Sequence, residues 1–157
     1  MSLTKSEIKY LRSLSQKKFR DQEKKFLLDG WQPRHEALSS DFWIDFVAVD
    51  KTTEGSSEHR LVLAGARKKS VSIKEVSRKE LKQISSTVHS QGIVALVHQK
   101  NYRLEAVLTK KSSLIVAADA VSDPGNLGSM IRSCDWFATD ALLLGKGCVE
   151  LHNEKVV

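Results

Sequence analysis

The sequence predicts an α/β protein in which a three-layer unit with a largely parallel sheet precedes a shorter second α/β unit. Over the first hundred residues, strand-like apolar runs alternate with helix-like stretches about four times, which is typical of helices packed on both faces of a sheet. After a polar and basic stretch at 100–113, two further apolar runs flank a turn and a helical pattern. We therefore expect one domain at 1–105 and the first part of another at 112–157.

The first elements of the larger unit follow from local signals. Ile8, Leu11 and Leu14 are spaced as on one face of a helix, which predicts a helix at the start. The next ten residues are polar and basic, and we expect them to form a connection. The run KKFLLDG predicts a strand that ends at Gly30, and Pro33 suits the first turn of the helix that follows.

The later elements of this unit have equally local signals. WIDFVAVD alternates and is rich in aromatic and β-branched residues, so it predicts a strand, as does VSIKEV after the helical segment EHRLVLAGARKKS. Ser77 and Glu80 form a capping box for the helix RKELKQISS. GIVALVHQ is continuously apolar and predicts a central strand. In order, the predicted elements are a helix at 5–14, a connection at 15–24, a strand at 24–30, a helix at 33–40, a strand at 43–50, a loop at 51–57, a helix at 58–70, a strand at 71–76, a helix at 78–86 and a strand at 92–99.

The second unit opens with the strand LIVAADAV at 114–121 and continues to the strand ALLLG at 141–145. Between them, Pro124 and Gly125 predict a type II turn, after which Asn126 is expected to cap a helix. The expected buried face of that helix consists of Leu127, Met130, Ile131 and Cys134. A unit with two strands is too small to build its own core, so we expect the 157 residues to be part of a longer protein.

Arg132 is the residue that turns this loop into a candidate site. A helical side chain leans toward the helix N-terminus, so Arg132 should lie over the small residues three and four positions earlier. Asp123, Asn126 and Arg132 would then meet at the carboxyl end of a strand, where α/β folds bind ligands. This arrangement suits a phosphate or a ribose hydroxyl. The alternative is a well-capped helix whose Arg132 pairs with Asp123 or Asp135.

The charge distribution favours a polyanionic partner. The net charge is +6, and residues 1–25 hold eight Lys and Arg against three acidic residues, a local charge of +5. A basic end on a nearly neutral body indicates RNA or DNA binding. The alternative is a solvated, lysine-rich helix surface. The side chains expected to contact RNA are Lys17, Lys18, Arg20, Lys24 and Lys25.

Several classes of function are excluded by missing signals. No apolar run is long enough for a membrane helix, and the N-terminus has no secretory signal. Cys134 and Cys148 have no metal-ligand spacing, so we expect no metal and a reduced, cytoplasmic protein. GxGxxG and P-loop motifs are absent. GNLG matches the GxxG of a KH module, but a KH loop joins two helices and this one follows a strand.

The stretch from LIVAADAV to the end resembles the first motif region of the SpoU/TrmH family of RNA ribose 2′-O-methyltransferases. That region reads as a strand, then DPxNxGxxxRxxxxF, then a short strand and a glycine. The matching positions are Asp123, Pro124, Asn126, Gly128, Arg132 and Phe137. The resemblance implies methyl transfer from S-adenosylmethionine to a ribose 2′-hydroxyl of rRNA or tRNA, with Asn126 and Arg132 in the active site. It also places Asp123 and Gly128 at the RNA.

The same resemblance implies an architecture for the whole chain. The first hundred residues are similar to the substrate-binding domain that often precedes this catalytic domain, a fold shared with ribosomal RNA-binding proteins; Asp29 and Gly30 fit, whereas WQPRHEAL departs from the pattern. The catalytic domain is expected to be a SPOUT fold with a trefoil knot, acting as a homodimer. The family's second and third motifs do not occur here, so we expect this chain to lack the knot region and to be inactive alone, with the cofactor-binding residues beyond Val157.

Two other interpretations stay open. The chain is alternatively a non-catalytic RNA-binding module, or an α/β domain that binds a metabolite and no RNA. Trp31, Phe42 and Trp43 are candidates for stacking on bases, although their strand neighbours favour a core role. His89 and Gln91 are candidates for RNA contact, against a plain surface-loop role.

Overall fold

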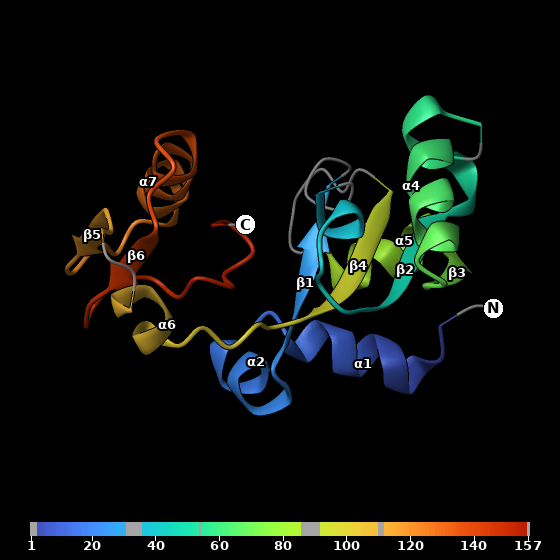
Figure 1. Cartoon of the computed structure of the whole chain (residues 1–157). Helices are drawn as coiled ribbons and strands as arrows, with labels where there is room; N and C mark the ends of the chain where they lie inside the picture. The colour runs from blue at the N-terminus through green and yellow to red at the C-terminus, as the bar shows by residue number, and fades with distance from the viewer. Residues whose placement is uncertain (1–2, 31–35, 54, 86–91, 110–111, 157) are drawn as a thin grey trace. The chain divides into compact units, whose positions relative to one another are not determined.

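The computed structural model describes residues 3–30, 36–53, 55–85, 92–109 and 112–156 (Figure 1). They form two compact units, residues 1–99 and 100–157, and each unit is described by itself. None of the described helices is both long enough and apolar enough to cross a membrane.

The first unit alternates helices and strands as the sequence predicts. Its elements are α1 (Lys5–Ser13), α2 (Lys17–Glu23), β1 (Lys25–Asp29), β2 (Ile44–Asp50), the 3₁₀ helix η1 (Lys51–Thr53), α4 (Ser57–Lys68), β3 (Ser72–Val76), α5 (Arg78–Ile84) and β4 (Ile93–His98). Residues 36–39 are also helical, whereas the predicted helix start at Pro33 lies outside the described residues. The predicted capping box is confirmed, because the Ser77 side chain accepts from Glu80 N while the Glu80 side chain accepts from Ser77 N.

The predicted largely parallel sheet is wrong. The strand order is β1-β4-β2-β3, and only β2 and β3 pair in parallel, because β4 runs antiparallel to both β1 and β2. β4 begins where β2 ends, since Asp50 N donates to Gly92 O at 2.7 Å. Its continuous apolar run does identify a central strand, but an apolar run carries no information about strand direction.

Helices cover both faces of the mixed sheet, so the three-layer arrangement is confirmed. One face packs under α4, with Val62 and Ala66 fully or nearly fully buried against β2 and β4. The other face packs under α1 and α5, where Leu11 and Leu81 are each 1% exposed. The apolar positions of each strand alternate between these two cores, as a sheet covered on both sides requires.

The predicted connection at 15–24 is wrong, because this segment contains α2. The helix has no continuous apolar face, so periodicity misses it. Arg20 fixes it instead: this side chain is 4% exposed, and its Nη1 donates to Leu14 O at 2.8 Å and to Ser15 O at 2.7 Å. These carbonyls follow the end of α1, where a cation is favourable.

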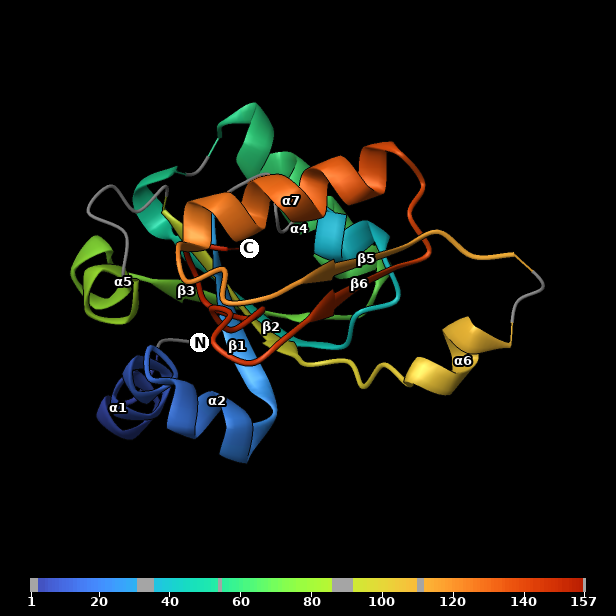
Figure 2. The same cartoon turned by 90° about the vertical axis from the view of Figure 1, so that its left-hand side faces the viewer.

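The second unit confirms the predicted strand, helix and strand. It contains α6 (Leu104–Leu108), β5 (Ile115–Ala118), α7 (Pro124–Trp136) and β6 (Ala141–Leu144). β5 and β6 pair in parallel, with Ile115 opposite Ala141, and α7 runs alongside them (Figure 2). The carboxyl end of β5 therefore leads directly into the loop that starts α7.

Candidate functional site

The candidate site is built on the first turns of α7. Asp123 is the N-cap, and its Oδ1 accepts from Asn126 N at 2.7 Å. The predicted type II turn with Asn126 as N-cap is wrong, because Gly125 has no positive φ and Pro124 already occupies the first helical position. The fixed φ of proline suits that position, so the helix starts before Asn126.

Arg132 lies as the sequence predicts. Its Nη2 donates to Ser129 Oγ at 3.2 Å, and its Nη1 would be 3.4 Å from a Cβ placed on Gly128. Across the described residues, no carboxylate lies within ion-pair distance of Arg132, so the alternative pairing with Asp123 or Asp135 is not adopted. The guanidinium is exposed, and its other N–H groups are available to a ligand.

Gly128 has a packing role in the structure. It is buried, and a Cβ at this position would be 3.0 Å from Val156 O. The missing side chain lets the backbone near Val156 approach α7 closely. Gly128 is therefore covered on the side where a side chain would project, and its contact with RNA stays a prediction.

Asn126 completes a row of polar groups on α7. Its side chain is exposed and has no hydrogen-bond partner among the residues that the structure describes. Asn126, Ser129 and Arg132 follow each other at intervals of three residues, so they lie along one side of the first three turns. The row offers an amide, a hydroxyl and a fixed positive charge, which together suit a ribose and its phosphate.

The side of α7 next to this row is mainly apolar, and Ser129 lies at the boundary between the two. Leu127 is fully buried, as predicted, whereas Met130, Ile131 and Cys134 are only partly covered. A groove of about 450 Å³ runs along this side. Its lining consists of Leu114, Val116, Ser129, Met130, Ser133, Cys134, Phe137 and Thr139. Its only polar side chains are hydroxyls, so the groove offers no charge to a ligand.

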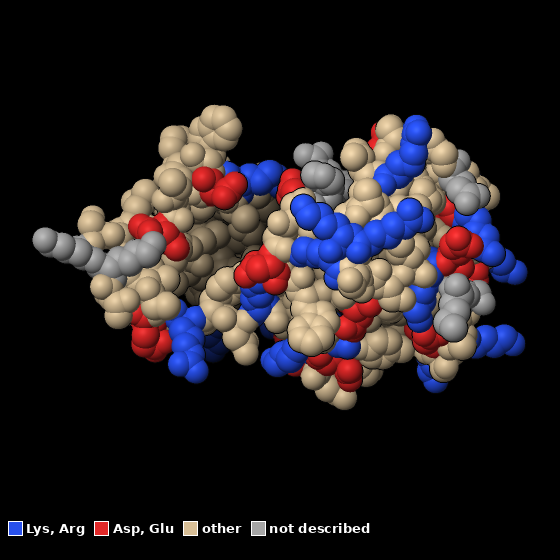
Figure 3. Space-filling view, turned by 45° about the vertical axis from the view of Figure 1, so that its right-hand side comes forward, with Lys and Arg blue, Asp and Glu red and all other residues tan. Residues whose placement is uncertain are grey.

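The predicted RNA-binding side chains of the first unit fall into two groups. Lys17, Lys18 and Lys24 are exposed, and Figure 3 shows Lys and Arg side chains spread over the face in view with carboxylates among them. Arg20 is buried on backbone carbonyls, so the structure gives it a packing role, and its contact with RNA stays an untested prediction. Lys25 is half-buried and paired with Asp45, at 2.6 Å between Nζ and Oδ2.

Asp45, Lys25 and His98 form a charged cluster that the sequence analysis does not predict. The Oδ1 of Asp45 lies 2.7 Å from His98 Nε2, and its Oδ2 is the acceptor for Lys25. Burial opposes ionisation of Asp45, but the hydrogen bonds from Lys25 and His98 outweigh it, so the pKa of this carboxyl lies below its usual range. The hydrogen bond to Asp45 raises the pKa of Lys25. A carboxylate inside an otherwise apolar strand is the signal that marks the cluster in the sequence.

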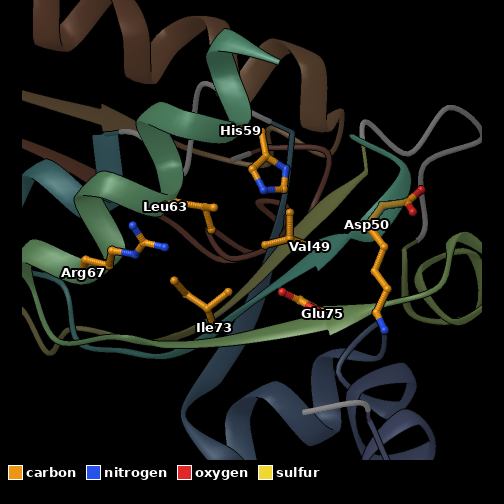
Figure 4. Close-up of a pocket in the computed structure, with 8 residues that line it drawn as sticks. Val49, Asp50, His59, Leu63, Arg67, Ile73 and Glu75 are labelled. Atoms are coloured by element: carbon orange, nitrogen blue, oxygen red, sulfur yellow. The ribbon is translucent and has the colours of Figure 1, made fainter. Parts of the chain in front are cut away.

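The first unit also has a cavity of about 320 Å³ between α4 and the strands β2 and β3 (Figure 4). His59, Leu63 and Arg67 project from α4 toward the strands, at intervals of four residues. Glu75 of β3 and Asp50 of β2 bring opposite charge to the lining. His59 is held by Thr53, at 3.1 Å between Nδ1 and Oγ1. The mixed charges give this cavity no clear preference for an anion.

The aromatic residues predicted to stack on bases differ in their exposure in the structure. Phe42 meets Phe26 edge to face, with ring centroids 6.5 Å apart, and belongs to the core. Trp43 is 72% exposed. Trp31, His89 and Gln91 lie outside the described residues. Over the described ranges, no group of three His, Cys, Asp or Glu side chains is arranged to hold a metal ion.

Two family models match the chain in succession. Residues 5–95 match the MRM3-like substrate binding domain, and residues 113–157 match the SpoU rRNA Methylase family. The second match contains the whole row of polar groups on α7.

Curated proteins match over nearly the same span. The 23S rRNA (guanosine(2553)-2′-O)-methyltransferase RlmP of Bacillus subtilis is 29% identical over 156 residues, which covers 99% of this chain and 58% of that protein. The mitochondrial rRNA methyltransferase 3 of Homo sapiens is 31% identical over 144 residues, 88% of this chain and 33% of that protein. The chain thus spans about three-fifths of the first relative's length and one-third of the second's.

Solved structures share the fold. The AdoMet-bound rRNA methyltransferase from Sinorhizobium meliloti superposes with a TM-score of 0.81 at 25% identity, covering 99% of this chain and 59% of that one. A structure described as an RNA 2′-O ribose methyltransferase gives a TM-score of 0.76 at 27% identity, again covering 59% of the compared chain.

Proposed function

The chain belongs to the MRM3-like substrate-binding and SpoU rRNA methylase families, and from this we propose that it serves methyl transfer from S-adenosylmethionine to a ribose 2′-hydroxyl of rRNA or tRNA. The observation that carries the proposal is the row of Asn126, Ser129 and Arg132 on α7, which lies inside the methylase match. The relatives named above act on rRNA, so rRNA is the first substrate to test.

Arg132 acts by position and charge. A guanidinium keeps its proton at any ordinary pH, so Arg132 is no base for the 2′-hydroxyl. Held over α7 by Ser129, it can bind the phosphate next to the reacting ribose and stabilise negative charge there. The Asn126 amide can orient the ribose through hydrogen bonds, because its side chain is free of partners among the described residues.

S-adenosylmethionine supplies the methyl group in this proposal, but the groove along α7 does not match its charged groups. The cofactor carries a sulfonium, an amine and a carboxylate, whereas the groove along α7 is lined by apolar side chains and three hydroxyls. We therefore propose that other residues complete the cofactor site and that the 157 residues alone do not transfer methyl groups.

The two parts of the chain divide the work in this proposal. Residues 1–105 bind the RNA substrate, through side chains that include the exposed Lys17, Lys18 and Lys24, and residues 112–157 supply the first part of the catalytic domain. In this proposal the carboxylate oxygen of Asp123 that does not cap α7 contacts the RNA. We further propose a homodimer that acts in the cytoplasm, although the human relative is named as mitochondrial.

The rival function is RNA binding without catalysis. The uncharged groove along α7 favours it, since a chain with no cofactor site can still present the basic first unit to RNA. Calorimetry with S-adenosylmethionine and fluorescence anisotropy with an rRNA fragment separate the two on this chain.

The catalytic proposal is tested with the protein encoded by the complete gene. Transfer of a radiolabelled methyl group into rRNA should fall at least about a hundredfold in Asn126→Ala and Arg132→Ala, with the product resistant to alkali as a 2′-O-methyl ribose requires. Lys146→Ala, an exposed change in the same unit, is the control and should leave the rate unchanged. Equal rates in all three variants would remove the proposed site.

A further inference from the structure

Trp43, the residue just before β2, presents an aromatic ring to solvent. The indole is 72% exposed while the preceding Phe42 packs into the core, so the chain turns one aromatic ring inward and the next outward. The backbone of Trp43 is fixed, because its carbonyl oxygen accepts from His98 N at 2.9 Å. A single exposed apolar residue needs no explanation by itself. The contacts that hold the Trp43 ring, however, call for an explanation.

The Trp43 ring is backed by His98. Their ring centroids are 5.5 Å apart and the planes are inclined by 38°. His98 is itself clamped, because Asp45 accepts from its Nε2 at 2.7 Å and is bound in turn by Lys25. These residues come from three adjacent strands, β1, β4 and β2, so the backing ring is held by the sheet. Among the described residues, His98 is the only ring in contact with Trp43, which leaves the other indole face open.

An irregularity in β2 produces this arrangement. The pairing of β2 with β4 shifts register between Ile44 and Phe46, so Asp45 is an extra residue on β2. Such bulges re-aim a side chain, and they are common next to binding sites. Here the bulge brings the Asp45 carboxylate to His98 and Lys25, on the same side of the sheet as α1 and α2.

Exposed lysines of the same unit supply free positive charge. Lys24 is exposed, and its carbonyl oxygen accepts from the backbone N–H of Gln99, the neighbour of His98, at 2.8 Å. Lys17 and Lys18 are exposed at the start of α2, one short helix away along the chain. Lys25 is neutralised by Asp45 and does not add to this charge. An exposed aromatic face on a unit that also carries free lysines is the combination that binds single-stranded nucleic acid.

A protein partner fits this surface less well. Among the described residues of the first unit, the only other exposed large apolar side chain is Leu61, on α4. One indole is far too small for a stable protein interface, which buries on the order of 800 Å² on each partner. A nucleobase, by contrast, is covered by a single ring.

We propose that Trp43, backed by His98, is a stacking platform for an unpaired base of the RNA substrate, and that Lys24, Lys17 and Lys18 bind the flanking phosphates. This inference rests on the proposed function, because it requires an RNA substrate. It adds that the RNA is single-stranded where it contacts the substrate-binding domain. Asp45 and Lys25 are positioning residues, because they act through His98.

The test measures binding of the full chain to two labelled probes, a short oligouridylate and an RNA duplex of equal length. Trp43→Ala should weaken binding of the single strand by roughly tenfold or more, while Trp43→Phe stays within about threefold, because phenylalanine still stacks. Duplex affinity should not change, since paired bases offer no free face. Leu61→Ala is the matched control for loss of exposed apolar surface, and circular dichroism confirms folding of each variant.

The results separate the platform from the wider function. Lys18→Glu should weaken the binding of both probes. For the single strand, the slope of log binding constant against log salt concentration should become shallower by about 0.7 for each phosphate that the side chain no longer neutralises. If the wild type binds the single strand and Trp43→Ala binds it equally well, the platform is wrong and the proposed function stands. If the wild type binds neither probe, RNA binding by this chain fails, and the platform fails with it.

Discussion

Two arginines in this chain have different roles, and the burial of their side chains distinguishes them. Arg20 is 4% exposed and donates to Leu14 O and Ser15 O, so it is part of the first unit's interior. Arg132 is exposed on α7 and bonds only the Ser129 hydroxyl among described residues. In the sequence, neither arginine has a local signal that shows whether its side chain is buried.

Replacing Arg20 should therefore destabilise the protein without a direct effect on RNA. Arg20→Met removes the donor from the buried Leu14 carbonyl and the partly buried Ser15 carbonyl, which costs about 1–3 kcal/mol of unfolding free energy. Lys18→Met, on the exposed side of the same helix, should change it by less than about 0.5 kcal/mol. Urea unfolding followed by circular dichroism measures both, and equal midpoints for the two variants would contradict the assigned role of Arg20.

Glu7 gives the first unit a pH-dependent contribution. The hydrogen bond from Lys74, with those from Thr4, lowers the pKa of Glu7 from 4.5 to about 2. A carboxyl whose pKa is depressed on folding stabilises the protein fully above its unfolded pKa, and the contribution is lost as the pH falls toward the folded value. Glu7→Gln should thus lower Tm at neutral pH, with the difference shrinking between pH 4.5 and 2. Glu36→Gln, which changes an exposed carboxylate on another helix, is the matched comparison.

At the scale of elements, capping chemistry starts the helices. Thr4 with Glu7 and Ser77 with Glu80 form capping boxes on α1 and α5, and Asp123 caps α7. The sequence predicts the box at Ser77 because both partners lie within one turn. It misplaces the start of α7, because Pro124 fits both a turn and a first helical position, and only the backbone path decides between them.

Loss of the Asp123 cap should loosen the start of α7. Asp123→Ala removes the acceptor for Asn126 N and should cost about 0.5–2 kcal/mol, whereas Asp123→Asn keeps an acceptor and should cost less. Hydrogen exchange of the amides in the first turn of α7 reports the effect locally. Unchanged protection in Asp123→Ala would show that the cap is not what holds this turn.

At the scale of the whole molecule, the chain consists of two compact units joined near residue 100. Residues 99–103 have no regular structure, and Tyr102 within them is 72% exposed. Limited trypsin digestion should cleave after Arg103 before it attacks either sheet, because the exposed backbone can enter the protease. Mass spectrometry of the early fragments tests this, and early cuts within β1–β4 would contradict the division.

The sequence by itself determined most helices and strands, the capping box at Ser77, the lean of Arg132 and the resemblance to the methylase family. These features depend on residues within a few positions of each other, where sequence spacing is also spatial spacing. Only the tertiary structure decided that β4 runs antiparallel, that Arg20 and Gly128 are buried, and that Asp45 clamps the histidine behind Trp43. The last contact joins residues 53 positions apart, at Asp45 and His98. Such partners are set by strand order, direction and register, which no local pattern encodes.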